Sequence, residues 1–152
     1  MKYCFLSLFI FLFSCHHQPN GEATIGKVAL KKSFIDPGPG YSQAVVTEAN
    51  GIKTIYISGQ VGTGATFEEQ FRDALGKLFI TLENSGASFD DVVKYNTYIV
   101  GYQPAYLDTF RRVRKALLGD KDMPASTLVG VEALGLPEWR VEIEATAVLT
   151  TN

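Results

Sequence analysis

Apolar side chains recur at helical spacing in two stretches of the chain. The first helix is predicted to begin after Thr66, which forms a capping box with Glu69, and Gly86 is suited to end it in a left-handed conformation. Its predicted buried face consists of Phe67, Phe71, Ala74, Leu75, Leu78 and Leu82. Pro104 suits the first turn of a second helix, whose predicted buried face is Tyr106, Phe110, Val113 and Leu117.

Six other segments have the β-branched, aromatic or alternating composition that is typical of strands. They span residues 28–34, 41–48, 52–58, 91–100, 126–134 and 140–150. Asn50-Gly51 predicts a type I′ hairpin turn, while residues 36–40 predict a turn and 59–64 a loop. The predicted order is three strands, a helix, a strand, a helix and two strands. This order predicts a two-layer α+β domain, in which the two helices cover one face of a mixed sheet.

The last strand predicts which of its side chains face the helices. Val141, Ile143, Ala145, Ala147 and Leu149 alternate with Glu142, Glu144, Thr146 and Val148, so the second set lies on the helix-free face. Tyr56, Val129 and Val131 are expected on comparable faces, where water would be an unfavourable neighbour. This pattern favours a partner subunit against the helix-free face.

The first residues form a short apolar run after Lys2, which is too short to span a bilayer and is typical of a secretory signal. Leu12-Phe13-Ser14-Cys15 resembles a bacterial lipobox. We therefore expect a signal peptide over residues 1–14, lipidation of Cys15, a tether over 15–26 and a folded domain over 27–152. The alternative is a secreted protein that is cleaved nearby, in which Cys15 is incidental. The lipobox reading predicts an exported protein anchored in the bacterial cell envelope, and His16 in place of Asp gives no signal for inner-membrane retention.

Composition restricts the possible chemistry. A formal charge of −2 over 152 residues provides no net basic field for nucleic acid. The cysteines, Cys4 and Cys15, precede the domain, so no metal site or nucleophile there can be built from Cys. The histidines, His16 and His17, fall in the tether, and we expect neither metal nor cofactor. The cationic residues of the second helix are interpreted as a solvated surface: Arg111, Arg112, Arg114 and Lys115.

Several short motifs in a fixed order resemble the RidA/YjgF family of enamine/imine deaminases over residues 27–149. They are Gly40-Tyr41-Ser42-Gln43-Ala44, Ile57-Ser58-Gly59-Gln60-Val61, Asp91-Val92-Val93-Lys94, Met123-Pro124-Ala125-Ser126-Thr127 and Val141-Glu142-Ile143-Glu144-Ala145-Thr146-Ala147. The resemblance implies a homotrimer with clefts between subunits. It also implies hydrolysis of small 2-imino acids to 2-oxo acids and ammonia without a cofactor.

The resemblance also implies roles for individual residues. Glu142 would be the carboxylate beside the attacking water. The substrate-binding positions would be Tyr41, Ser58, Gly59, Gln103, Tyr106, Ser126 and Thr127. Gln103 stands where the family often has asparagine, and Ser126 stands where it has the arginine that holds the substrate carboxylate. A serine hydroxyl cannot replace a bidentate guanidinium, so this exchange predicts about tenfold to a hundredfold weaker binding of an anionic substrate.

Simpler interpretations exist for the same residues. Glu142 or Glu144 could be an outward-facing strand carboxylate paired with Lys53 or Lys94. Tyr41 and Trp139 could serve packing alone, and Ser58-Gly59 could be an ordinary strand end. Arg140 could take over the role of the missing arginine.

Two functional hypotheses follow. The first is an exported imine deaminase or related hydrolase. The second is a membrane-tethered trimer without catalytic activity, which binds a small ligand or a protein in its clefts. Ser126 and the signal-like N-terminus favour the second hypothesis or an altered substrate, whereas Glu142, Tyr41 and Ser58 favour a retained pocket.

Overall fold

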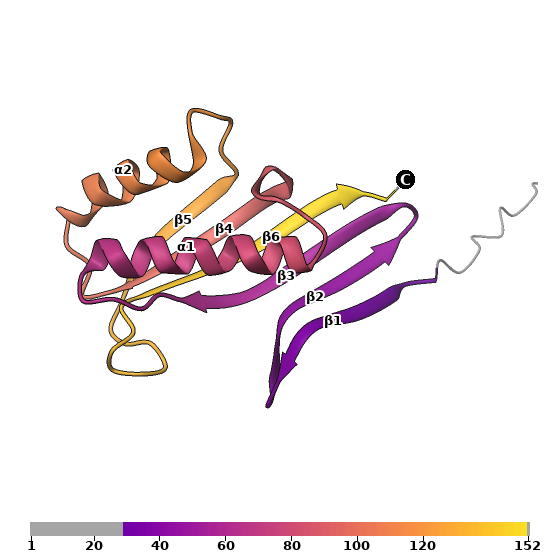
Figure 1. Cartoon of the computed structure of the whole chain (residues 1–152), viewed down its shortest axis with the longest axis horizontal. Helices are drawn as coiled ribbons and strands as arrows, with labels where there is room; N and C mark the ends of the chain where they lie inside the picture. The colour runs from indigo at the N-terminus through magenta and orange to yellow at the C-terminus, as the bar shows by residue number, and fades with distance from the viewer. Residues whose placement is uncertain (1–28, 152) are drawn as a thin grey trace, which may run out of the picture.

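The computed structural model describes residues 29–151, which form a six-stranded sheet with two helices on one face (Figure 1). The strands are β1 (Lys31–Gly38), β2 (Tyr41–Ala49), β3 (Ile52–Val61), β4 (Val92–Val100), β5 (Ala125–Val131) and β6 (Val141–Thr150). The helices are α1 (Phe67–Asn84) and α2 (Tyr106–Leu118), with a short 3₁₀ turn at Phe89–Asp91. The predicted α+β class is confirmed.

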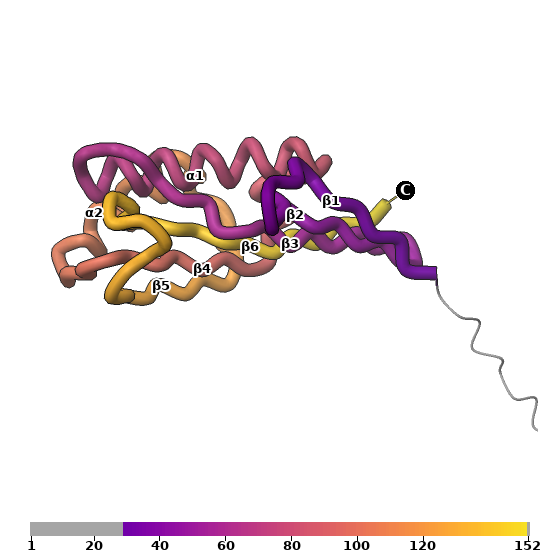
Figure 2. Tube along the Cα trace, turned by 90° about the horizontal axis from the view of Figure 1, so that it is seen from below, coloured from indigo at the N-terminus to yellow at the C-terminus, as the bar shows by residue number. Residues whose placement is uncertain are grey.

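The sheet order is β1-β2-β3-β6-β4-β5. All neighbouring strands are antiparallel except β4 and β5, which run parallel because α2 connects them across the helix layer. Seen edge-on, both helices lie on the same side of the sheet (Figure 2). The mixed two-layer architecture is therefore as predicted.

The core lies between α1 and the central strands. All six apolar residues predicted for the buried face of the first helix are buried, and the Thr66–Glu69 capping box is present. Val141, Ile143, Ala145 and Ala147 of β6 face the helices, with exposed fractions between 0% and 5%. The apolar face of the helix, which repeats every 3.6 residues, thus packs on the apolar face of the strand, which repeats every two.

The end of α2 differs from the prediction. Leu117 is 41% exposed, whereas the neighbouring Leu118 is 7% exposed. The chain turns away at Gly119, which has a φ of +73°, and Leu118 is covered there. Leu117 instead borders a surface hollow with Phe79 and Phe89.

Three predicted boundaries are also wrong. The segment Asp36-Pro37-Gly38 belongs to β1, because an edge strand tolerates a proline and Asp36 bends the chain with a φ of 45°. Strand β3 continues through Gly59 to Val61 by way of a bulge, and β5 ends at Val131. The turn at Asn50-Gly51 is as predicted, with positive φ at both residues.

The helix-free face of the sheet carries exposed apolar side chains. Tyr56 is 53% exposed, and Val129 and Val148 are each 37% exposed. Their register partners place them on the same face as Glu142 and Thr146. These apolar residues therefore lie on the predicted face, and no helix or strand of residues 29–151 covers them.

Candidate functional site

A wedge opens in the sheet where β2 and β3 separate. The two strands pair from Ala44–Ile57 to Ala49–Ile52, and beyond Ala44 the start of β2 pairs with β1 alone. Figure 1 shows this end of the β1–β2 hairpin diverging from β3, and Figure 2 shows it rising toward the helix layer. Gln60 bridges the opening, since its Nε2 donates to Gln43 Oε1 at 2.9 Å.

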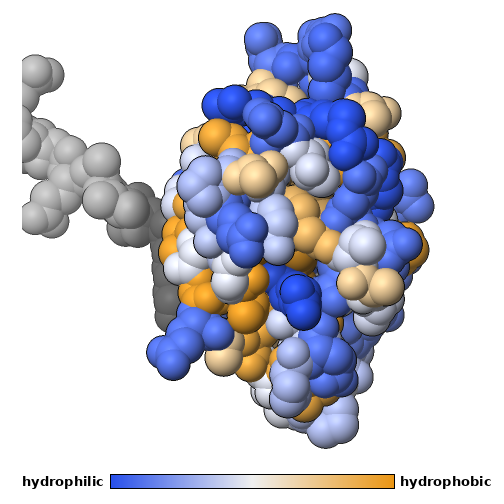
Figure 3. All heavy atoms as spheres, turned by 90° about the vertical axis from the view of Figure 1, so that its left-hand side faces the viewer, coloured by the Kyte–Doolittle hydropathy of each residue, from blue (hydrophilic) through white to orange (hydrophobic). Residues whose placement is uncertain are grey.

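A pocket of about 380 Å³ occupies the wedge, a volume within the range of small-molecule sites. It is lined by Tyr41, Gln43, Gly59, Gln60, Val61, Lys77, Trp139 and Glu142. Three residues expected in a substrate site, Tyr41, Gly59 and Glu142, are therefore brought together. Near this pocket, the end of the molecule where α1 begins presents a mixture of hydrophilic and hydrophobic side chains (Figure 3).

Glu142 depends on the glycine beside it. A Cβ atom at position 59 would lie 1.6 Å from Glu142 Oε1 and 2.5 Å from its carboxyl carbon. The bulge between Ile57 and Gln60 brings the β3 backbone against this side chain. Only glycine leaves room for the carboxylate in its present position.

The Glu142 carboxyl has a perturbed acidity. Burial raises its pKa above the ordinary value, and the negative charge of Glu144 raises the pKa further. The interpretation of Glu142 or Glu144 as partner of Lys53 or Lys94 is wrong. Lys53 Nζ donates to Ser85 O at 2.6 Å, and Lys94 Nζ donates to Thr127 Oγ1 at 2.5 Å.

Lys77 of α1 brings a positive charge to the same pocket. Its ammonium donates to Val61 O at 2.9 Å and pairs with Asp73 at 2.8 Å. Its side chain remains 38% exposed. This placement could not be predicted from the sequence, because a lysine on an amphipathic helix usually faces solvent.

Trp139 lies against the pocket because Gln70 fixes its loop. Gln70 is 3% exposed, and its amide donates to Glu138 O at 3.0 Å and accepts from the Arg140 backbone N–H at 2.8 Å. The carbonyl before Trp139 and the N–H after it are thereby held to α1. Trp139 therefore lines the pocket, and its ring also lies against Gly135 in the same loop.

The other expected site residues do not line this pocket. Ser58 Oγ donates to Ser42 O at 2.6 Å, which ties β3 to β2 at the base of the wedge. Gln103 is exposed, and Tyr106 stacks on Phe67 with ring centroids 4.5 Å apart. In this position Tyr106 packs the two helices together.

Ser126 and Thr127 lie on the edge strand β5, and both are exposed. Ser126 is the register partner of Tyr95, and Thr127 that of Asn96. The two side chains therefore point to opposite faces. Arg140 is likewise absent from the pocket lining.

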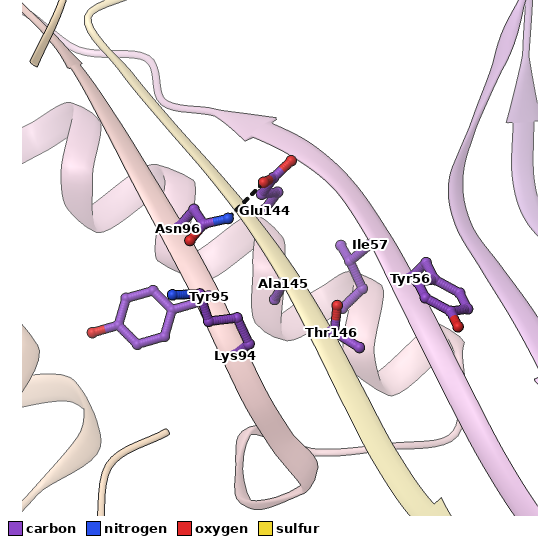
Figure 4. A pocket seen from close by; sticks show the side chains of 8 residues that line it. All are labelled: Tyr56, Ile57, Lys94, Tyr95, Asn96, Glu144, Ala145 and Thr146. Atoms are coloured by element: carbon purple, nitrogen blue, oxygen red, sulfur yellow. Dashed lines mark hydrogen bonds between the residues drawn. The ribbon is translucent and has the colours of Figure 1, made fainter. Parts of the chain in front are cut away.

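A second, smaller cavity of about 200 Å³ lies farther along the sheet and contains none of the expected residues (Figure 4). Its carboxylate, Glu144, accepts from Asn96 Nδ2 and from Tyr98 Oη, each at 2.8 Å. The bond to Glu144 raises the pKa of Tyr98. Glu144 already accepts two hydrogen bonds, whereas the Glu142 carboxyl has none from residues 29–151, so the larger pocket is the better candidate for chemistry.

Five lining residues were not assigned to the site from sequence: Gln43, Gln60, Val61, Lys77 and Trp139. Gln43, Gln60 and Val61 fall within motifs that already pointed to the site, so their positions were available from the sequence. Lys77 and Trp139 come from distant segments and meet the pocket only through the fold.

Two further findings concern the described part of the chain. Within residues 29–151 there is no group of three or more His, Cys, Asp and Glu side chains that could hold a metal ion. No helix of the same residues is long and apolar enough to cross a membrane. Cys15 and the predicted signal peptide lie outside these residues.

The fold and the pocket together place this protein among small α+β domains that carry a carboxylate in a pocket where two strands of the sheet separate. The family model for Endoribonuclease L-PSP matches residues 32–149, most of the chain. The chain therefore belongs to this family, which includes the RidA/YjgF proteins.

Individual relatives agree with this assignment. A 2-iminobutanoate/2-iminopropanoate deaminase of Dermatophagoides farinae is 34% identical over 74% of this chain and 87% of its own length. A member of the YjgF/YER057c/UK114 family from Mycobacterium tuberculosis is 29% identical over 78% of this chain and all of its own, with a TM-score of 0.66. RidA from an Antarctic Psychrobacter is 28% identical over 76% of this chain and 94% of its own, with a TM-score of 0.63.

Proposed function

We propose that this protein hydrolyses small imines, with 2-imino acids as the substrate class and Glu142 as general base. The observation that carries the proposal is a carboxyl without an ion pair in the described chain, with a raised pKa, held over Gly59 in a pocket of suitable volume. A relative named as a 2-iminobutanoate/2-iminopropanoate deaminase supports the reaction type.

The chemistry requires one water molecule and no cofactor. Glu142 accepts a proton as the water oxygen bonds to the imine carbon, and the electron pair of the C=N bond moves to nitrogen. The carboxyl then returns the proton to nitrogen, which gives a carbinolamine. Glu142 next accepts the proton of the carbinolamine hydroxyl and passes it to the amino nitrogen, so that the C=O bond forms as the C–N bond breaks and ammonia and a 2-oxo acid leave. A raised pKa suits this exchange, because it brings the carboxyl closer to the pH at which it can both accept and return a proton.

We also propose that further copies of this chain cover the helix-free face and form a trimer. Tyr56, Val129 and Val148 give this face its exposed apolar surface. Ser126 lies on the edge strand and outside the pocket of its own chain, so its contact with a ligand would require another copy. Tyr56→Glu should then lower the mass of the purified domain in light scattering, whereas a monomeric wild type would refute the assembly.

The reaction is tested by generating 2-iminopropanoate in situ with an amino acid oxidase and following its loss. Wild type should exceed the buffer rate, and Glu142→Gln should lower kcat by about a hundredfold or more, as loss of a general base does. The proposed function is refuted if wild type and Glu142→Gln both match buffer.

The same assay tests the role of position 126 through the KM of a Ser126→Arg variant. Serine offers no charge-assisted contact, so we expect a high KM in wild type and a lower KM in Ser126→Arg. Equal KM values in the two proteins would refute a role for position 126. Saturable binding without turnover would favour the alternative of a binding protein.

A further inference from the structure

Lys77 has no role in the reaction outlined above, yet it is the one cationic side chain among the residues that line the pocket in the described chain. We propose that Lys77 binds the carboxylate of the ligand from within the same subunit. This inference relies on the proposed function for the identity of the substrate but not for the binding of an anion.

The ammonium has a hydrogen-bond donor to spare. A protonated lysine carries three N–H donors. One is directed to Val61 O at 2.9 Å and another to Asp73 Oδ2 at 2.8 Å. The third is available to a ligand, because the Lys77 side chain is 38% exposed and lines the pocket.

Asp73 holds the lysine in place without cancelling its charge for a ligand. Its Oδ2 also accepts from the Thr63 backbone N–H at 2.8 Å and from Thr63 Oγ1 at 2.7 Å. The Asp73 charge is therefore shared among three donors, and the other anchor of Lys77, the Val61 carbonyl, belongs to a residue that lines the pocket. An ammonium fixed in this way loses little conformational freedom on binding a carboxylate.

The pocket lining indicates the class of ligand. Gln43 and Gln60 provide amide groups, while Tyr41 and Trp139 provide flat apolar surface. One cation and one carboxylate, Glu142, favour a ligand with a single negative charge at one end. We therefore expect small monocarboxylates, such as a 2-oxo or 2-imino acid, to bind better than dicarboxylates.

Trp139 supplies a direct probe, because it is the sole tryptophan of the chain and lines the pocket. Titration of the full domain with 2-oxobutanoate, followed by tryptophan fluorescence, gives the affinity without turnover. Lys77→Met should weaken binding about tenfold to a hundredfold, the range expected for a lost charge-assisted contact. Lys77→Arg should keep the affinity within a few-fold.

Two controls separate binding from structure. Lys53→Met removes another lysine that donates to a backbone carbonyl, at Ser85, but it lies outside the pocket and should leave the affinity unchanged. The neutral analogue 2-oxobutanamide should bind wild type and Lys77→Met equally. Thermal unfolding of every variant reports whether the fold is retained.

The outcomes distinguish this inference from the proposed function. If a folded Lys77→Met binds 2-oxobutanoate as wild type does, or loses the amide and the acid equally, the inference is overturned. If the lysine variants behave as expected while wild type fails to hydrolyse 2-iminopropanoate, the carboxylate site stands and the reaction is refuted. If hydrolysis occurs, Lys77→Met should raise KM more than it lowers kcat.

Discussion

The contact between Gly59 and Glu142 allows the candidate site to be perturbed by a single methyl group. In Gly59→Ala the new Cβ would lie 1.6 Å from Glu142 Oε1, whereas ordinary van der Waals contact begins near 3.4 Å. The carboxylate must therefore retreat by roughly 1.8 Å, the difference between these distances, while the β3 backbone stays in the bulge.

The size of the expected effect follows from that displacement. Misplacing a catalytic group by about 1 Å costs on the order of a hundredfold in rate. Gly59→Ala should thus lower kcat in the imine assay by about a hundredfold or more. The change in stability should be modest, because the φ of Gly59 is not in the left-handed region and the displaced atoms belong to a flexible side chain.

Gly76→Ala is the matched control. It makes the same substitution inside α1, where an added Cβ would meet nothing within 4 Å. It should leave kcat unchanged and stabilise the domain, since alanine is favoured over glycine in a helix by about 1 kcal/mol. If a folded Gly59→Ala hydrolyses imines at the wild-type rate, the position of the Glu142 carboxylate over Gly59 is not needed for catalysis and its role as general base is refuted.

Three further predictions concern acidity, stability and location. Because the charge of Glu144 contributes to the raised pKa of Glu142, Glu144→Gln should move the acid limb of the kcat profile to lower pH, and an unmoved limb would contradict that coupling. Glu68 of α1 pairs with Arg112 of α2 at 2.7 Å and with Arg72 of its own helix at 2.9 Å, and these contacts lower its pKa to about 2. A depressed carboxyl pKa stabilises the fold above the unfolded value near 4.5 and loses that contribution toward pH 2, so the Tm of wild type should fall in this window more than that of Glu68→Gln. Cys15→Ser in the full chain should release the protein from membranes in cell fractionation if the cysteine is lipidated, and continued attachment would refute lipidation.

The fold could largely be predicted because its signals are local and repeated. The capping box at Thr66, the Asn50-Gly51 turn and the alternation along β6 each depend on a few neighbouring residues. The predicted element boundaries and buried positions were wrong where contacts between distant residues determine the structure. The bulge at Ser58-Gly59 extends β3 because β6 continues to pair with it, and Leu118 is buried because the chain turns at Gly119.

The candidate site could be predicted in part. Tyr41, Gly59 and Glu142 were expected together and line one pocket. Trp139 reaches it through a loop held by Gln70, whose contacts with Glu138 and Arg140 join residues about 70 positions apart in the chain. Lys77 reaches it from α1, by the contact of its ammonium with Val61 O. Ser126 was expected in the same pocket, but it lies on the edge strand β5, two strands away from Glu142 on β6, and does not line the pocket.

The direction of β1 has a consequence for any attachment at the N-terminus. The strand enters the sheet at Lys31, opposite Glu48, and reaches the mouth of the wedge only at Gly38, opposite Tyr41. Seven residue steps at about 3.3 Å each separate these points by roughly 23 Å. The opening of the wedge therefore lies at the far end of β1 from Lys31, so a contact made at the start of this strand would leave the opening free for diffusing solutes.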